Sequence, residues 1–302
     1  MRYLGIALLA VSSIASAPSV GSTDDADAAV SYTGPVIDLH AHVFFDEEVA
    51  RSVDPDRLAT PDGFSADLSD PRLAKVAAVV IAPRGLEETR AENDQLREFV
   101  DRSDGFLLAA GSVHPDDGEQ ALNELERIAE LGFSMLKLHP ITQGFSLEAD
   151  SVREVVCKSG DLGLPVLFDF SGALRSSEIG DYITLAITCP QTQLVLAHAG
   201  MAKFHEVAIL ELLARYPWYR RNIWVEISYT AGMYAGSPYH EQFVWVLRRV
   251  GMDRVLFASD YPLSTSSEAI ADVERLGLTA EEMHRVFYAN ASELLRLTEE
   301  RP

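Results

Sequence analysis

The amino-acid sequence predicts an α/β fold, a closed (β/α)8 TIM barrel of the metal-dependent hydrolase type, and three observations support this prediction. The chain has 302 residues, which is long enough for such a barrel in a single domain. Short apolar segments alternate with segments of helical periodicity, which is typical of a parallel sheet. Eight such apolar segments can be counted, and eight repeats point to a closed barrel.

The eight predicted strands are short and apolar, as expected for strands that are buried on both faces. They span residues 36–42, 77–82, 106–113, 134–139, 165–170, 193–198, 223–228 and 255–260. Helical patterns fill most of the gaps, at residues 87–102, 118–131, 151–159, 178–188, 205–216, 241–250, 268–276, 280–288 and 292–297. Residues 44–70 have weak periodicity, and we expect them to form an active-site loop after the first strand.

The N-terminal residues are predicted to lie outside the barrel domain, which we place at residues 33–302. Arg2, the apolar run 3–11 and the small residues Ala15-Ser16-Ala17 have the pattern of a signal peptide over residues 1–17. The run is too short to span a membrane, and residues 18–32 have the composition of a linker. We therefore expect a periplasmic or secreted protein with no membrane contact after cleavage; an uncleaved anchor or a disordered start is the alternative.

The charge and the cysteine content limit which binding partners and which kind of metal site are expected. The net charge of −21 disfavours nucleic acid and anionic membranes, so we expect a small-molecule substrate; pairing of outer helices in a homodimer stays open. Cys157 and Cys189 are the two cysteines, and the absence of a Cys-x-x-Cys pair excludes a zinc ribbon. An exported chain could pair them, but nothing in the sequence brings them together, so buried free thiols are expected.

Histidines and aspartates stand at the ends of the predicted strands: His40 and His42, His139, Asp169, His198 and Asp260. In a (β/α)8 barrel these carboxyl ends converge on one mouth, where the active site lies. His40 and His42 are two residues apart and share one face of their strand, so they can bind one ion. A lone His-x-His pair is weak evidence, but together with His198 and Asp260 it predicts a metal site.

Several segments, taken in order, resemble an amidohydrolase-related family (amidohydrolase 2) of the metal-dependent hydrolase superfamily. The resemblance is to the branch that includes the aminocarboxymuconate-semialdehyde-type decarboxylases, and it covers residues 36–297. The segments are Ile37-Asp-Leu-His-Ala-His42, Asn93-Asp-Gln-Leu96, Gly111-Ser-Val-His-Pro115, Lys137-Leu-His-Pro140, Leu196-Ala-His-Ala-Gly200, Phe257-Ala-Ser-Asp-Tyr-Pro262 and Asn290-Ala291.

The resemblance implies roles for individual residues. His40, His42 and Asp260 would ligate one divalent ion, zinc before manganese or another metal, and Asp260 would also handle the proton of the attacking water. His198 would polarise the substrate or ligate a second ion, which is the less favoured arrangement. Lys137 stands where some superfamily members carry a carboxylated, metal-bridging lysine, although Lys-Leu-His-Pro fits a single metal better.

Other roles are inferred from the residues themselves. Lys137 is a barrel-layer residue or a clamp for an anionic substrate group, and His139 forms a turn or faces the mouth. We take both as candidate substrate-binding residues. Glu226 alternates with apolar neighbours, so it supports the site with a partner or faces outward.

Asp169 is a departure from the family pattern, which has a histidine at the end of the fifth strand. A carboxylate can still bind a divalent ion, with a shift in preference toward harder metals. We expect Asp169 to be a further metal ligand; the alternative is an altered or impaired site.

The expected function is metal-dependent hydrolysis of an amide, ester or lactone bond in a small substrate by metal-activated water. One alternative is metal-dependent, non-oxidative decarboxylation of an unsaturated or aromatic acid. Another, which rests on Asp169, is a metal-depleted barrel that binds a ligand without turnover.

Overall fold

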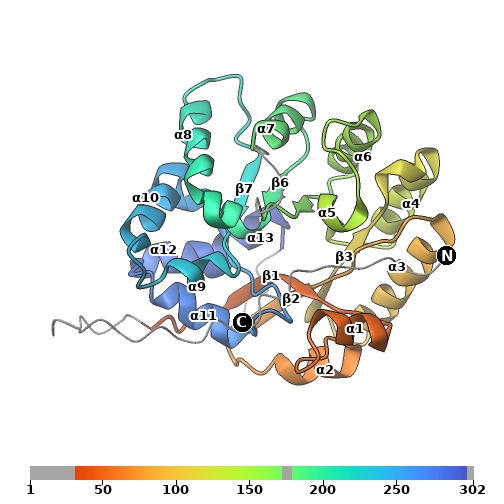
Figure 1. The fold of residues 1–302 in the computed structure, drawn as a ribbon, viewed down its shortest axis with the longest axis horizontal. Coiled ribbons are helices and arrows are strands. Elements are labelled where there is room, and N and C mark those ends of the chain that lie inside the picture. Colours follow the sequence, from red (N-terminus) through yellow and green to blue (C-terminus); the bar gives the residue numbers. More distant parts are fainter. Residues whose placement is uncertain (1–30, 172–178, 298–302) are drawn as a thin grey trace.

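The computed structural model describes residues 31–171 and 179–297, and its centre is a sheet of eight parallel strands (Figure 1). The strands are β1 (Val36–His42), β2 (Leu73–Val79), β3 (Leu107–Ser112), β4 (Met135–Leu138), β5 (Val166–Phe168), β6 (Leu194–Leu196), β7 (Ile223–Glu226) and β8 (Val255–Leu256). They pair in chain order. Hydrogen bonds from His42 N to Tyr261 O and from Asp260 N to His40 O, both 2.8 Å, connect the end of β8 back to β1. The predicted (β/α)8 barrel is confirmed.

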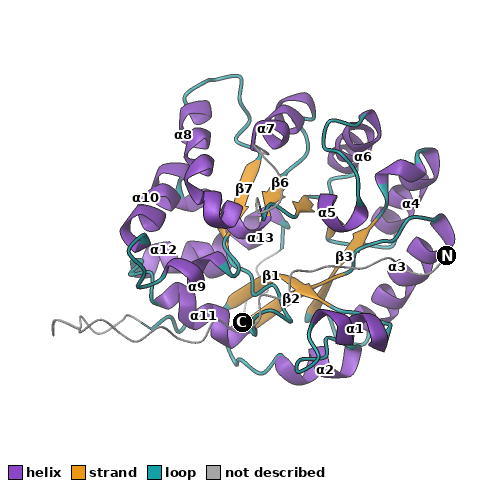
Figure 2. Cartoon of the chain, in the orientation of Figure 1, coloured by secondary structure: helices purple, strands orange, loops and turns teal. Residues whose placement is uncertain are grey.

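Helices surround the sheet, as Figure 2 shows. They are α1 (Glu47–Val53), α2 (Pro61–Asp67), α3 (Leu86–Asp101), α4 (Glu119–Glu130), α5 (Pro140–Gln143), α6 (Asp150–Asp161), α7 (Ile179–Thr188), α8 (Ile209–Ala214), α9 (Thr230–Tyr234), α10 (His240–Val250), α11 (Ser266–Glu274), α12 (Ala280–His284) and α13 (Asn290–Leu294). The apolar stripe of α4, with Leu125 and Ile128 fully buried, shows how each amphipathic pattern turns one face to the sheet. Within the described residues, no helix is long and apolar enough to cross a membrane.

Each predicted strand corresponds to an observed one, and the differences lie at the ends. The second strand begins at Leu73 and not at residue 77. The prediction began too late because Lys75 interrupts the apolar pattern; in the structure its ammonium group donates to Gly105 O at the surface. The predicted strands that end at His198 and Asp260 are longer than β6 and β8. Both residues have a positive φ, 64° and 59°, so the chain has already left the strand conformation there.

The prediction that residues 44–70 form a loop is wrong in part, because this segment contains α1 and α2. The side chain of Asp46 accepts from backbone N–H groups at the start of α1, and Thr60 does the same for α2, where Pro61 follows directly. Phe64 of α2 is fully buried and makes an edge-to-face contact with Tyr261, with ring centroids 5.6 Å apart. The insertion therefore packs against the residues that follow β8.

The expected signal peptide, residues 1–17, and most of the expected linker lie outside the described residues. Tyr32, the last residue of that linker, packs on the barrel. Its N–H donates to Glu274 Oε1 (2.9 Å) and its ring stacks on Phe287, with centroids 4.9 Å apart. The packed domain therefore includes Tyr32.

The two cysteines form a disulfide bond between Cys157 in α6 and Cys189 just after α7. The prediction of two free thiols is wrong. The cysteines are 32 residues apart in the chain, and only the barrel places α6 and α7 side by side. The bond joins two neighbouring helices of the outer ring.

We predict that reduction of this disulfide lowers the stability of the folded protein. Closing a loop of this length restricts the unfolded chain, and its loss costs about 3–4 kcal/mol of unfolding free energy. Urea unfolding with and without reductant measures the difference. The double variant Cys157→Ser/Cys189→Ser serves as the control, since reductant should leave its midpoint unchanged. Equal midpoints for the oxidised and reduced protein would contradict the prediction.

Candidate metal centre at the barrel mouth

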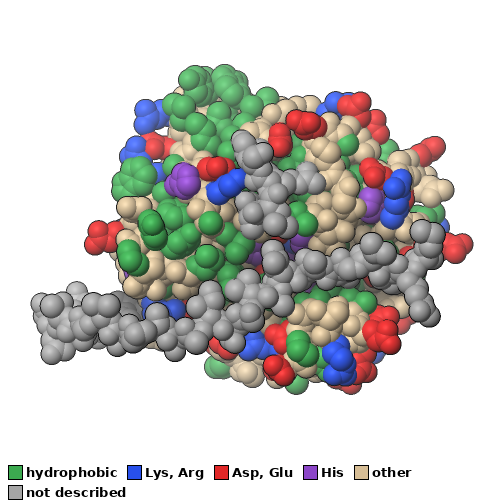
Figure 3. Space-filling model, viewed as in Figure 1, with side chains coloured by type: hydrophobic (Ala, Val, Ile, Leu, Met, Phe, Trp, Pro, Cys, Tyr) green, Lys and Arg blue, Asp and Glu red, His purple; other side chains and the backbone are tan. Residues whose placement is uncertain are grey.

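The side chains at the carboxyl ends of the strands gather in one buried cluster, which we call the mouth cluster. Its members are His40 and His42 of β1, Lys137 of β4, Asp169 after β5, His198 after β6, Glu226 of β7 and Asp260 after β8, each at most 8% exposed. Figure 3, which looks down on the ring of helices, shows histidine atoms near the middle of this face. The sequence-predicted residues therefore lie together.

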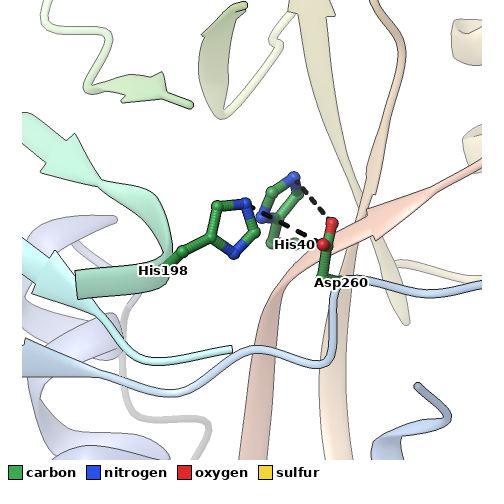
Figure 4. Close-up of side chains that lie close together, drawn as sticks. All are labelled: His40, His198 and Asp260. Atoms are coloured by element: carbon green, nitrogen blue, oxygen red, sulfur yellow. Dashed lines mark ion pairs between the residues drawn. The ribbon is translucent and has the colours of Figure 1, made fainter. Parts of the chain in front are cut away.

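Three members of the cluster have the geometry of a metal site. His40, His198 and Asp260 each offer a ligand atom, and these atoms all lie within 4.8 Å of one another. The Asp260 carboxylate contacts both histidines: His40 Nε2 is 3.4 Å from Asp260 Oδ1, and His198 Nε2 is 3.8 Å from Asp260 Oδ2 (Figure 4). The spacing would allow all three residues to reach one ion.

His42 and Asp169, which the sequence predicts as ligands, each contact a member of this group. His42 Nε2 is 3.0 Å from His40 Nε2 and 3.5 Å from Asp260 Oδ1. Asp169 Oδ1 is 3.5 Å from His198 Nε2. His198, expected to polarise the substrate or to ligate a second ion, thus lies within reach of the same ion as His40 and Asp260, and Asp169 lies beside His198.

Lys137 and His139, the predicted substrate-binding residues, lie at different depths. Lys137 is fully buried, with Nζ 2.9 Å from His40 Nε2. The His139 side chain is 14% exposed, and its Nδ1 accepts from Thr142 N at the start of α5. Burial lowers the pKa of His139 to about 4, and its ring lies 3.7 Å from Asp169. Of the two, His139 is nearer to solvent.

Glu226 faces the cluster, which decides between the two orientations that the sequence left open. Its Oε2 is 3.4 Å from His40 Nδ1 and accepts from Ser228 Oγ at 3.0 Å. Ser228 Oγ in turn lies 3.0 Å from His198 Nδ1. Sequence analysis missed Ser228, because a serine after a strand carries no signal by itself.

Asp38, which the sequence analysis also passed over, fastens β1 to the residues after β8. Its carboxylate accepts from Ser259 N (3.0 Å), from Ser266 Oγ (2.7 Å) and from His40 N (3.3 Å). These bonds fix the backbone on both sides of the His40 and Asp260 pair. The sequence carried no clear signal for this role, because β1 has a register shift between Asp38 and Ala41 and strict alternation does not predict where Asp38 points.

The backbone around the cluster adopts conformations that residues other than glycine rarely take. His198, Tyr229 and Asp260 have φ values of 64°, 59° and 59°. Hydrogen bonds hold two of them in place, from Thr230 Oγ1 to His198 O (2.5 Å) and from Asp260 N to His40 O. Such strained residues are concentrated at functional sites, where the surrounding structure maintains them.

Burial and charge shift the ionisation of the cluster in opposite directions. Burial raises the pKa of Asp260 to about 7. Burial lowers the pKa of His198, but the negative charges of Asp260 and Asp169 outweigh it and raise the value to about 9. The pKa of His40 falls well below its usual value, because the ring is buried and Lys137 is close. His40 is therefore a neutral imidazole with a lone pair to offer.

The charges of the cluster fit a divalent ion. Three acidic groups, Asp169, Glu226 and Asp260, face two basic ones, Lys137 and His198, so the acidic groups outnumber the basic ones. Buried charges are costly unless they are paired or coordinate a metal. A divalent ion would supply the missing charge, and imidazole and carboxylate are donors for zinc and manganese.

Comparison with known proteins agrees with the fold. A family model described as amidohydrolase matches residues 37–297. The chain belongs to the amidohydrolase family. This match confirms the resemblance inferred from the sequence motifs. A search of curated proteins gave no match.

Solved structures of similar fold were found at low sequence identity. A 2,6-dihydroxybenzoate decarboxylase from Rhizobium has a TM-score of 0.67 at 18% identity, covering 88% of this chain and 99% of that one. A dihydroxybenzoic acid decarboxylase from Polaromonas, with bound manganese and 2-nitroresorcinol, has a TM-score of 0.65 at 17% identity, covering 88% and 98%. A Pseudomonas putida protein, provisionally described as a 2-pyrone-4,6-dicarboxylic acid hydrolase, has a TM-score of 0.62 at 20% identity, covering 87% and 97%. At this identity they show the fold that this amidohydrolase shares.

We predict that Asp38→Ala destabilises the protein far more than Asp38→Asn. Alanine leaves the buried N–H groups of Ser259 and His40 without an acceptor, at a cost of about 2–4 kcal/mol, whereas asparagine keeps one acceptor oxygen. Urea unfolding of both variants measures the difference in unfolding free energy. Equal stability of Asp38→Ala and the wild type would contradict the role given to Asp38.

Proposed function

We propose that this amidohydrolase is a metal-dependent hydrolase that cleaves an amide, ester or lactone bond of a small substrate. The observation that carries the proposal is the convergence of His40, His198 and Asp260, whose ligand atoms lie within 4.8 Å of one another at the barrel mouth. These residues would hold one divalent ion. His42, 3.0 Å from His40, is the nearest further ligand.

The ion would supply Lewis acidity, lowering the pKa of a water from 15.7 to about 7 and polarising the substrate carbonyl. Asp260 lies against both histidine ligands, so its carboxylate can accept the proton of that water and return it to the leaving group. The ammonium group of Lys137, whose Nζ is 2.9 Å from His40 Nε2, limits the repulsion among the buried carboxylates. His139, at the more exposed edge, can contact the substrate.

Decarboxylation of an unsaturated or aromatic acid is a second candidate, favoured by a different observation. Two of the structural neighbours are decarboxylases of dihydroxybenzoates, and one of them contains manganese. An ion held by the same residues could bind the carboxylate of the substrate, and this reaction needs no attacking water. The neighbours support manganese as well as zinc for the metal.

We propose that the protein acts outside the cytoplasm, in the periplasm or after secretion. The disulfide between Cys157 and Cys189 supports this, because disulfides persist mainly in oxidising compartments. The signal-peptide pattern of residues 1–17 supports it independently.

We predict that protein purified without chelators contains about one equivalent of a divalent transition metal, and that His40→Ala loses both the metal and the activity while it stays folded. The variant lacks the His40 imidazole, one of the proposed metal ligands, so metal binding is lost, whereas the circular dichroism spectrum should be unchanged. Elemental analysis is the measurement. Less than about half an equivalent in the wild type would instead support a barrel that binds ligands without turnover.

We predict that hydrolysis outweighs decarboxylation when both are measured on the same preparation. The two probes are 2-pyrone-4,6-dicarboxylate, a lactone, and 2,6-dihydroxybenzoate, with ring opening and CO2 release as readouts. A panel of small esters, amides and lactones extends the first arm, and Asp260→Asn serves as the inactive control in both. CO2 release without hydrolysis of any panel member would establish the decarboxylase alternative.

A further inference from the structure

Two histidines of the mouth cluster are connected to one carboxylate on the side that faces away from Asp260. His40 Nδ1 is 3.4 Å from Glu226 Oε2, and His198 Nδ1 is 3.0 Å from Ser228 Oγ. Ser228 Oγ donates to the same oxygen, Glu226 Oε2, at 3.0 Å. All four residues are buried, so this connection is shielded from water.

The direction of each hydrogen bond follows from the acceptor at its end. The hydroxyl proton of Ser228 is used toward Glu226, so Ser228 Oγ accepts from His198 Nδ1–H. The other carboxylate oxygen, Oε1, accepts from Ser228 N. His40 Nδ1 faces Oε2, and because a carboxylate oxygen accepts, the ring proton lies on Nδ1.

We propose that Glu226 is a positioning residue that sets the tautomer of both histidines at once, directly for His40 and through Ser228 for His198. With the protons held on Nδ1, the Nε2 lone pairs of both rings point toward Asp260. Metal-bound histidines are commonly oriented by a carboxylate behind the ring. Here a single β7 carboxylate serves two ligands from two strands. This inference rests on the metal site proposed above.

Glu226→Gln is the sharpest test, because the amide keeps the shape of the carboxylate but cannot accept at both ends. If its NH2 group faces Ser228 N–H, two donors oppose each other. If it faces His40, it donates to Nδ1 and moves the ring proton to Nε2, where it blocks the metal. We expect zinc affinity to fall about 10- to 100-fold, the usual effect of removing such a partner.

Two variants serve as controls. Ser228→Ala removes the acceptor of His198 and one donor to Glu226, but leaves the Glu226 carboxylate beside His40, so it should alter the ¹⁵N NMR signals of His198 and keep the proton of His40 on Nδ1. Glu124→Gln replaces another fully buried glutamate, which lies in α4, accepts from Asn93 of α3 and Arg127 of α4, and contacts neither histidine. It should keep wild-type zinc affinity even where it lowers stability.

The measurements are zinc affinity and ¹⁵N NMR of histidine-labelled protein, which identifies the protonated ring nitrogen. In zinc-loaded wild type we expect protons on Nδ1 of His40 and His198. Protonated Nε2 on either ring, or Glu226→Gln with wild-type zinc affinity and unchanged spectra, would overturn the proposal.

A wild-type protein that binds no zinc or manganese would count against the proposed function, and the metal-free spectra would then decide the inference. A proton on His40 Nδ1 in the wild type that moves to Nε2 in Glu226→Gln would support the role of Glu226. The same tautomer in both proteins would overturn it.

Discussion

The burial of charge at the barrel mouth is the constraint on which the site depends. Three carboxylates and a lysine lie together with at most 5% exposure, in a barrel whose strands are mostly apolar. Such a group is stable only if each charge has a partner. Ser228 Oγ donates to the Glu226 carboxylate, and His40 and His198 contact the Asp260 carboxylate. The remaining negative charge is what makes the cluster suited to a cation.

The same constraint explains why the surrounding backbone is so strongly held. His198 and Asp260 adopt left-handed conformations that cost energy, and each is held by a hydrogen bond, from Thr230 of α9 to His198 O and from Asp260 N to His40 O of β1. Asp38 ties β1 to the segment after β8 and to the start of α11. The cluster is therefore a rigid part of the fold and not a set of side chains on mobile loops.

Much of this architecture could be predicted from the sequence. The bounds of β1, residues 36–42, agree at both ends, because all seven residues are buried and read as one apolar run around the histidines. Strand ends mark the barrel mouth, so His40, His198 and Asp260 could be placed together from the sequence alone. The remaining features depend on tertiary neighbours. The Cys157–Cys189 bond requires two helices to be adjacent, and Ser228 gains its role only from the Glu226 and His198 beside it.

X-ray absorption spectroscopy of the protein loaded with one equivalent of zinc tests the central claim most directly. The account predicts at least two imidazole ligands, with zinc–nitrogen distances of about 2.0–2.1 Å, and a carboxylate oxygen in the same shell. His198→Ala should remove one imidazole from that shell. A zinc ion surrounded by oxygen alone, or an unchanged imidazole count in His198→Ala, would contradict the assignment of the ion to His40, His198 and Asp260.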